Sequence, residues 1–234
     1  MAELTSRDRI LDAACDLFIA EGYEHTTVAR IRAKSGVSNG TLFHHFPTKE
    51  AILDALYTDA MKGVNRRYHE ALASPPGSLR DLLRSVVGVI LSFAVEEPDE
   101  AKIIYDLAPP GRESPSREEL DLESAQLLKA IKNAMSPYRE TGELKAMPDR
   151  AMMSILTGPA HLISQYWLSE PDQFPPPTNL IEVLADAALA GLTGSPTEGT
   201  HPPLPSASQV KIELVDQDGN SLGSGSGTID LKQH

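Results

Sequence analysis

Four small polar residues, Ser38-Asn39-Gly40-Thr41, follow a Ser-Gly-Val turn in the first quarter of the chain. An asparagine amide can pair with the edge of adenine. A threonine can hydrogen-bond a base edge or place its methyl group against that of thymine. Gly40 adds no side chain, so it allows a close approach of the backbone. These residue types, side by side at the start of a helix, predict a surface that reads nucleic-acid bases.

The charge around this run is locally positive, although the whole chain carries a net charge of −12. Residues 25–49 hold four basic residues, three histidines and no acidic residue, whereas residues 71–234 hold 12 basic and 23 acidic residues. A local surface can attract phosphate while the bulk of a protein is acidic, so the net charge argues only against extended non-specific binding. Lys49 and the free amides at the start of the next helix are expected phosphate contacts.

Two short helices with a glycine turn between them are expected around this run. Thr27 and Ser38 are good N-cap residues and predict helices over residues 27–34 and 38–45. Gly36 lies at the turn, where a helix-turn-helix needs glycine. The second helix of such a pair carries its N-terminal residues into the major groove. The apolar residues expected to lock the pair are Val28, Ile31, Val37, Leu42 and Phe46.

The remaining sequence predicts further helices. Apolar residues at helical spacing predict a first helix over residues 6–21 and, after Pro47, a long helix capped by Thr48 that reaches about residue 72. Beyond a break at residues 74–77, similar patterns predict helices over residues 79–95, 99–107, 117–138, 149–169 and 178–192. The sequence therefore predicts an all-α fold.

The composition changes to Gly, Pro, Ser and Thr from residue 194. Within this tail, residues 210–214 alternate, and Asp218-Gly219 is a hairpin turn signal. A lone hairpin is marginal in water, so the tail is either loosely ordered or a small hairpin that clips onto a partner or another subunit. The expected domains are residues 1–52 and 53–193, followed by a tail over 194–234 that is flexible or forms a β-hairpin.

Two stretches, Thr26-Thr27-Val28 and the segment SGVSNGTLFHHFPTKEA over residues 35–51, resemble the DNA-binding domain of the tetracycline-repressor (TetR) family. The resemblance covers residues 7–57 and is dense there. It implies an N-terminal helix-turn-helix domain of three helices and a larger C-terminal helical bundle that binds a small molecule and joins two copies. It implies a bacterial transcriptional regulator, a homodimeric repressor that a small-molecule effector releases from palindromic double-stranded operator DNA.

Carried over by position, the resemblance places Ser38 to Thr41 against bases and the residues after them along the DNA backbone. The DNA-binding set is Thr27, Ser38, Asn39, Gly40, Thr41, Phe43, His44, His45 and Lys49. Position 43 is usually tyrosine, whose hydroxyl reaches a phosphate, so Phe43 has a role in apolar contact or in packing. Arg32 stands where a small residue is usual and either extends to solvent or DNA or changes the local packing.

The C-terminal part contains no nucleophile elbow, phosphate loop, HExxH or CxxC motif, so we expect no enzyme and no cofactor. Adjacent histidines on a helix point apart and chelate poorly, so His44 and His45 predict no metal site. Aromatic and polar residues within apolar helices are the candidates for ligand binding, although each also fits an ordinary core. They are Phe93, Tyr105, Asp106, Met152, His161, Gln165, Tyr166 and Trp167.

The resemblance implies that the last two helices pair across the dimer as a four-helix bundle, and small residues there allow close approach. The expected interface residues are Leu156, Ala160, Ile163, Leu180, Leu184, Ala188 and Gly191. Without a signal peptide, a membrane-length apolar run or a second cysteine beside Cys15, the chain is expected in the cytoplasm and off the membrane. The acidic C-terminal part leaves one other class open, a helical enzyme or interaction module that kept an N-terminal DNA-binding domain.

Overall fold

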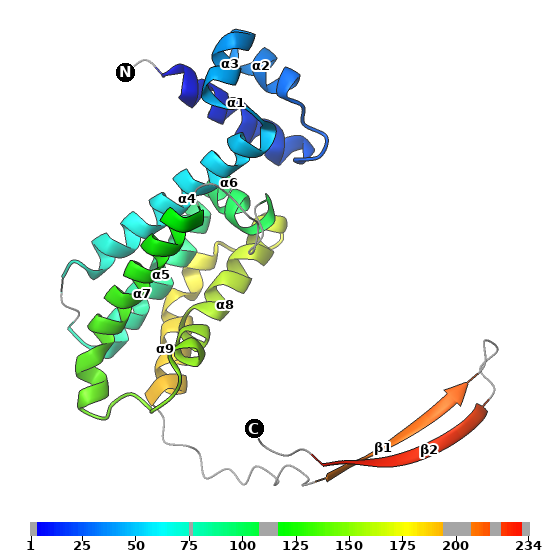
Figure 1. Ribbon diagram of the computed structural model, residues 1–234. Coiled ribbons are helices and arrows are strands. Elements are labelled where there is room, and N and C mark those ends of the chain that lie inside the picture. Colours follow the sequence, from blue (N-terminus) through cyan, green and yellow to red (C-terminus); the bar gives the residue numbers. More distant parts are fainter. Residues whose placement is uncertain (1–3, 75–76, 108–116, 194–206, 216–220, 231–234) are drawn as a thin grey trace. The chain divides into compact units, whose positions relative to one another are not determined.

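A computed structural model describes residues 4–74, 77–107, 117–193, 207–215 and 221–230. They fall into a helical unit, Met1–Gly194, and a second unit, Ser195–His234, which are described separately (Figure 1). The helices are α1 (Ser6–Glu21), α2 (Val28–Ser35), α3 (Asn39–His45), α4 (Lys49–Leu72), α5 (Leu79–Glu96), α6 (Pro98–Lys102), α7 (Arg117–Glu140), α8 (Asp149–Ser169) and α9 (Ile181–Thr193). A π-helical turn, η1 (Ile103–Leu107), follows α6, and a 3-10 turn, η2 (Pro177–Leu180), precedes α9.

Hydroxyl caps begin the first four helices. The side chains of Thr5, Thr27, Ser38 and Thr48 each accept a hydrogen bond from the backbone amide three residues further on. Such a cap contributes about 1 kcal/mol to helix stability. Gly36 ends α2 in the left-handed conformation, with φ of 69°, which costs a glycine little. These local signals explain why α1 to α4 begin and end within a residue of the predicted positions.

One apolar core joins α1, α2, α3 and the start of α4. Ile31 and Leu42 are fully buried in it, together with Ile10 and Ile52 from the flanking helices. Of the predicted locking residues, Val28 is only partly buried, whereas the others are buried. Ile103 of η1 also lies in this core, although it is far away in the sequence. The N-terminal helices are therefore fastened to a segment of the larger helical group.

A second core surrounds α5, which packs against α4, α7, α8 and α9. Leu83, Val86, Val87 and Leu91 of α5 are fully buried. Figure 1 shows α4 running from the N-terminal helices into this second group, so one helix contributes to both cores. The helical unit confirms the predicted all-α class. No helix within the described ranges is long and apolar enough to cross a membrane.

The second unit holds one antiparallel pair, β1 (Ala207–Val215) and β2 (Ser221–Asp230). Its register places Val210 opposite Gly227 and Leu214 opposite Gly223. β1 contains the alternating stretch seen in the sequence, and β2 is rich in glycine and serine. The turn signal at Asp218-Gly219 and the linker over 194–206 lie outside the described residues.

Candidate functional site

The N-terminal end of α3 presents the polar run that the sequence singled out. The hydroxyl oxygen of Ser38 lies 3.0 Å from the backbone nitrogen of Thr41 and 2.8 Å from its hydroxyl oxygen. Asn39 and Gly40 are exposed, and Thr41 is half-buried. All four positions share one helical turn, so the structure brings the predicted base-reading residues together at one exposed end.

The remainder of α3 has an exposed face beside a buried one. Phe43 is 47% exposed, and His44 and His45 are exposed, while Leu42 and Phe46 are buried in the N-terminal core. The two histidine rings lie 5.4 Å apart, centre to centre. Phe43 is therefore not a core residue, which leaves the contact role as the better of its two interpretations.

Lys49 has a structural contact that sequence reasoning missed. Its ammonium nitrogen lies 2.8 Å from the carbonyl oxygen of Tyr23 and 3.1 Å from that of Thr26, and 4.0 Å from the centre of the Tyr23 ring. These contacts fasten the loop before α2 to the start of α4. Two of the three ammonium donors are thereby used, and the phosphate contact by Lys49 stays a prediction.

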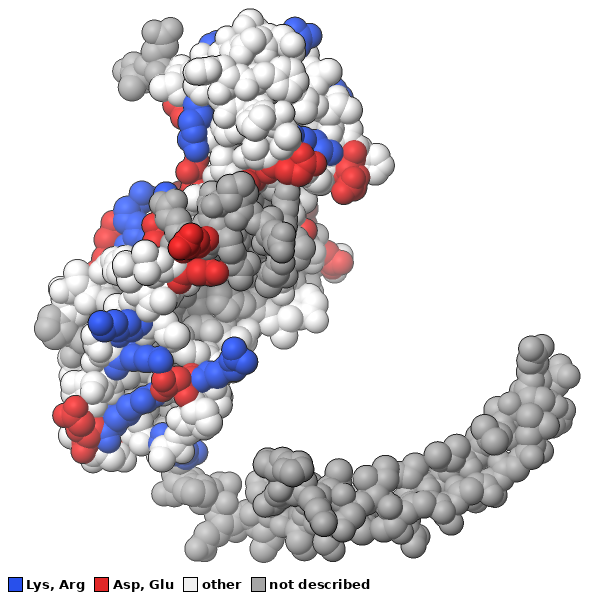
Figure 2. Space-filling view, viewed as in Figure 1, with Lys and Arg blue, Asp and Glu red and all other residues white. Residues whose placement is uncertain are grey.

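Residues 25–49 contain no acidic residue, but acidic side chains of α1 lie beside two of their basic residues. Arg30 forms an ion pair with Glu21 of α1, and the Lys34 ammonium lies 2.8 Å from a carboxylate oxygen of Asp16. Arg32 is exposed and has no ion-pair partner in the described part of the chain, which answers the packing question that its size raised. On the face drawn in Figure 2, the N-terminal helices are mostly uncharged and carry a few basic and acidic side chains at their margins. Net positive charge at this surface is therefore a weak source of attraction for a phosphate backbone, and specific contacts would have to supply more of the binding energy.

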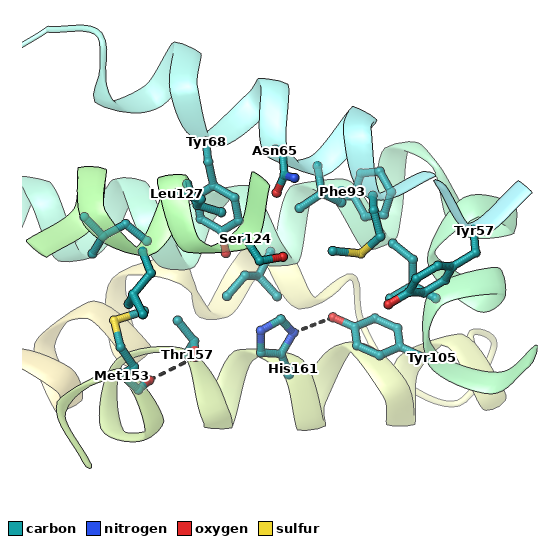
Figure 3. Close-up of a pocket in the computed structure, with 16 residues that line it drawn as sticks. Tyr57, Asn65, Tyr68, Phe93, Tyr105, Ser124, Leu127, Met153, Thr157 and His161 are labelled. Carbon is teal, nitrogen blue, oxygen red and sulfur yellow. Dashed lines mark hydrogen bonds between the residues drawn. The ribbon is translucent and has the colours of Figure 1, made fainter. Parts of the chain in front are cut away.

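A cavity of about 350 Å³ lies between α4, α5, η1, α7 and α8 (Figure 3). It is lined by Tyr57, Met61, Val64, Asn65, Tyr68, Ile90, Phe93, Ile104, Tyr105, Ser124, Leu127, Leu128, Ile131, Met153, Thr157 and His161. A largely apolar hollow with a few polar groups is typical of a small-molecule site.

Two of its polar groups form a pair. The hydroxyl oxygen of Tyr105 lies 2.7 Å from Nδ1 of His161. Burial raises the pKa of Tyr105 to about 12. The His161 side chain is exposed, yet the protein atoms packed around its ring lower its pKa below the ordinary value. Both groups are therefore uncharged at neutral pH. The side-chain amide of Asn65 donates to a carboxylate oxygen of Glu123 at 3.2 Å.

Three of the eight predicted ligand residues line the cavity: Phe93, Tyr105 and His161. The others do not. Met152 is buried in the second core and Trp167 packs in a small cluster beside it, whereas Asp106, Gln165 and Tyr166 are exposed. Adjacent helical positions point in different directions, so Met153 takes the place expected for its neighbour.

The contribution of α4 was missed entirely. Tyr57, Met61, Asn65 and Tyr68 recur every three or four residues and line one wall of the cavity. That helical spacing of aromatic and polar residues was a usable signal. The sequence signal was weaker for α7, which contributes Ser124, Leu127 and Leu128 to the lining.

The predicted interface residues lie on α8, η2 and α9, but mostly on faces that pack within the chain. Leu156, Ala160 and Ala188 are buried in its own core, so they are not available to a second copy. A Cβ at Gly191 would meet Ile155 at 3.0 Å, which identifies it as a contact between α8 and α9. Ile163 and Leu184 are half-buried against the same core, and Leu180 is exposed. The large exposed apolar residues on α8 and α9 are Leu162, Tyr166 and Val183.

Residues 10–56 match the family model described as "Bacterial regulatory proteins, tetR family". The transcriptional repressor KstR2 of Mycolicibacterium smegmatis is 32% identical, over 43% of this chain and 52% of its own length. The transcriptional regulator TcmR of Streptomyces glaucescens is 45% identical, over 41% of this chain and 43% of its own. The chain thus spans between a third and about half of the length of the curated relatives it matches.

A solved structure extends the likeness beyond the first three helices. A bacterial regulatory protein of the tetR family from Rhodococcus RHA1 aligns with a TM-score of 0.67 over 80% of this chain and 96% of that one. Its sequence is 21% identical, so it shows a shared fold.

Proposed function

Because the chain belongs to the tetR family of bacterial regulatory proteins, we propose that it is a transcriptional repressor that binds operator DNA through α3 and is released by a small molecule. The observation that carries the proposal is the polar turn from Ser38 to Thr41, exposed at its first three positions, on a helix anchored by the buried Leu42 and Phe46. A helix that is anchored by buried residues and carries polar side chains at its N-terminal end is what the major groove accepts.

Within this proposal, Asn39 and Thr41 read base edges, and Gly40 lets the backbone approach them. Thr27, Phe43, His44, His45 and Lys49 contact the DNA backbone, which fixes the register without reading sequence. Support comes from their placement, since all of them except the half-buried Lys49 are exposed. Lys49 retains one ammonium donor for a phosphate beyond its two carbonyl contacts.

The protein acts as a homodimer in this proposal, with α8 and α9 of one copy against those of the other. Leu162, Tyr166, Leu180 and Val183 expose apolar surface on α8, α9 and the turn η2 that leads into α9, and α8 contacts α9. A two-fold dimer presents two α3 helices about one DNA turn apart, or a small multiple of it, and so reads a palindrome.

The coupling from ligand to DNA runs through two shared segments. Ile103 of η1 is buried in the N-terminal core, whereas the adjacent Ile104 and Tyr105 line the cavity. Similarly, Ile52 of α4 lies in the N-terminal core and Tyr57 lines the cavity. A ligand that shifts either segment also shifts the helices that hold α3. The energetic requirement is that the ligand favours the arrangement with lower DNA affinity.

The test is an unbiased selection of binding sites from random DNA with the full chain at physiological salt. We expect enrichment of a two-fold symmetric site, and tighter binding to it than to shuffled DNA of the same composition. A protein that binds selected and shuffled DNA equally would contradict the proposal. The Ser38→Asp variant, which retains the helix cap, is the matched negative control.

A further inference from the structure

The described lining of the cavity contains no lysine, arginine, aspartate or glutamate. His161, the one lining side chain that ordinarily titrates near neutrality, is uncharged there because surrounding protein lowers its pKa. An ion in such a site loses its hydration and finds no opposite charge to replace it. The described lining therefore offers no charged side chain to a carboxylate, a phosphate or an ammonium group.

Aromatic rings supply much of the wall. Tyr57 and Tyr68 come from α4, Phe93 from α5 and Tyr105 from η1. Aromatic side chains pair with flat rings in stacked or edge-to-face arrangements, and the thioether of Met61 or Met153 can also pack on a ring. This composition favours a flat ring system over a flexible chain.

His161 gives the cavity one directed polar contact. Its Nδ1 is occupied by the Tyr105 hydroxyl, and Nε2 has no hydrogen-bond partner among the residues that the structure describes. Figure 3 shows the ring standing up from α8 into the cavity, below Ser124 and Asn65. We assign the Tyr105 hydroxyl as the donor to Nδ1, because a phenol is the stronger donor, and this assignment leaves the proton of the neutral imidazole on Nε2. Nε2–H is thus a hydrogen-bond donor without an acceptor among the described residues.

We infer that the cavity binds an uncharged, mostly aromatic ring system that presents a carbonyl or ether oxygen to Nε2–H of His161. Tyr105 is a positioning residue, since it fixes which nitrogen carries the proton. This inference rests on the proposed function, because it names the class of the effector.

Three compounds on one ring frame separate charge from hydrogen bonding. They are 2-(hydroxymethyl)anthraquinone, the charged anthraquinone-2-carboxylate, and 2-(hydroxymethyl)anthracene, which lacks the ring carbonyls. Binding to the full chain without DNA is followed by calorimetry and by quenching of Trp167, the single tryptophan of the chain, which packs against the small cluster that contains the lining residue Phe93. We expect the neutral quinone to bind at least about tenfold more tightly than either of the others.

Variants of His161 and Tyr105 test the hydrogen bond. His161→Phe should weaken quinone binding about tenfold and leave the anthracene compound unchanged, since only the quinone offers a ring oxygen. His161→Gln retains an N–H donor and should restore part of the affinity. Tyr105→Phe should also reduce quinone binding selectively, whereas damage to packing alone would weaken both compounds equally. Thermal unfolding of each variant checks that it is folded.

Three results would overturn the inference: carboxylate binding as tight as that of the quinone, no binding of the quinone, or an unchanged quinone affinity in His161→Phe. Operator binding by the ligand-free protein is measured separately. If site selection fails but the neutral quinone is still preferred, the proposed function falls while the assignment of the cavity stands. If the protein binds the operator and only the carboxylate releases it, the proposed function stands while the assignment of the cavity falls.

Discussion

The ammonium group of Lys49 lies 2.8 Å from the carbonyl oxygen of Tyr23 and 4.0 Å from the centre of the same residue's ring. It also donates to the carbonyl of Thr26, whose buried hydroxyl lies 3.0 Å from the carbonyl oxygen of Gly22. One side chain at the start of α4 therefore holds the loop that leads into α2. Since α2 packs with α3 in one core, the position of α3 depends on this contact.

Replacing Lys49 should affect both folding and DNA binding. Lys49→Ala removes two charge-assisted hydrogen bonds, so we expect the free energy of unfolding to fall by about 1–2 kcal/mol in urea titrations. Arg66→Ala is the control on the same helix, because its ion pair with Glu70 is exposed and 3.9 Å long. The salt dependence of DNA binding separates the structural role of Lys49 from a phosphate contact. A slope reduced by about one unit indicates a phosphate contact, and an unchanged slope contradicts one.

Two substitutions of Ser38 should separate helix capping from base contact. Ser38→Ala loses the hydrogen bond from the Thr41 amide and should reduce stability by about 1 kcal/mol. Ser38→Asp retains a capping oxygen but brings negative charge to the surface that faces DNA. We expect near-normal thermal stability in this variant and a loss of operator affinity of at least about tenfold. Normal DNA binding by Ser38→Asp would place the contact surface elsewhere.

Phe43 should contribute to DNA binding and little to stability. It is nearly half exposed, so Phe43→Ala should leave the melting temperature almost unchanged while weakening operator affinity. Phe43→Tyr adds a hydroxyl that can reach a phosphate and should tighten binding to all DNA sequences by a similar factor. Fluorescence anisotropy with operator and shuffled duplexes measures both effects. A large drop in melting temperature for Phe43→Ala would instead assign the ring to packing.

The proposed dimer depends on exposed apolar residues of α8 and α9. Leu162→Glu combined with Val183→Glu places like charges where the two copies would meet, so we expect monomers in sedimentation velocity with normal helical content. Leu122→Glu is the matched control, since Leu122 is just as exposed but lies on α7. If the double variant remains a dimer, the copies associate through another surface.

Stability should depend on pH through His161. Its pKa lies below the ordinary value of 6.5 in the folded chain, so the unfolded chain binds more protons as the pH falls below that value. The folded state therefore loses stability on acidification from about pH 6.5 to the lowered pKa and recovers it on the alkaline side. Tyr105, the titratable group in contact, stays neutral throughout. Urea titrations from pH 8 to 5 should show a smaller loss in His161→Gln, and an equal loss would assign the effect to other groups.

Local chemistry determined much of the N-terminal part from the sequence alone. Thr27, Ser38 and Thr48 cap helices where their hydroxyls predicted it, and Gly36 turns the chain where a left-handed residue was needed. Each signal involves residues within a few positions of one another. For the same reason, the exposure of Asn39 and Gly40 could be predicted once α3 was placed.

Only the tertiary structure decided what covers each helix face. Periodicity shows which residues share a face, but not which other segment packs on it. Arg30 and Lys34 appeared free of acids until α1 brought Glu21 and Asp16 beside them.

The same limit explains why several predicted residues of the C-terminal half lie away from the cavity or face the chain's own core. α8 is apolar on more than one side, so its sequence does not distinguish Leu156, which faces the core, from Leu162, which faces out. The pairing of Tyr105 with His161 joins segments 56 residues apart and depends on how η1 packs against α8. The chain's local chemistry determined where the helices are, and long-range packing decided what each of their faces does.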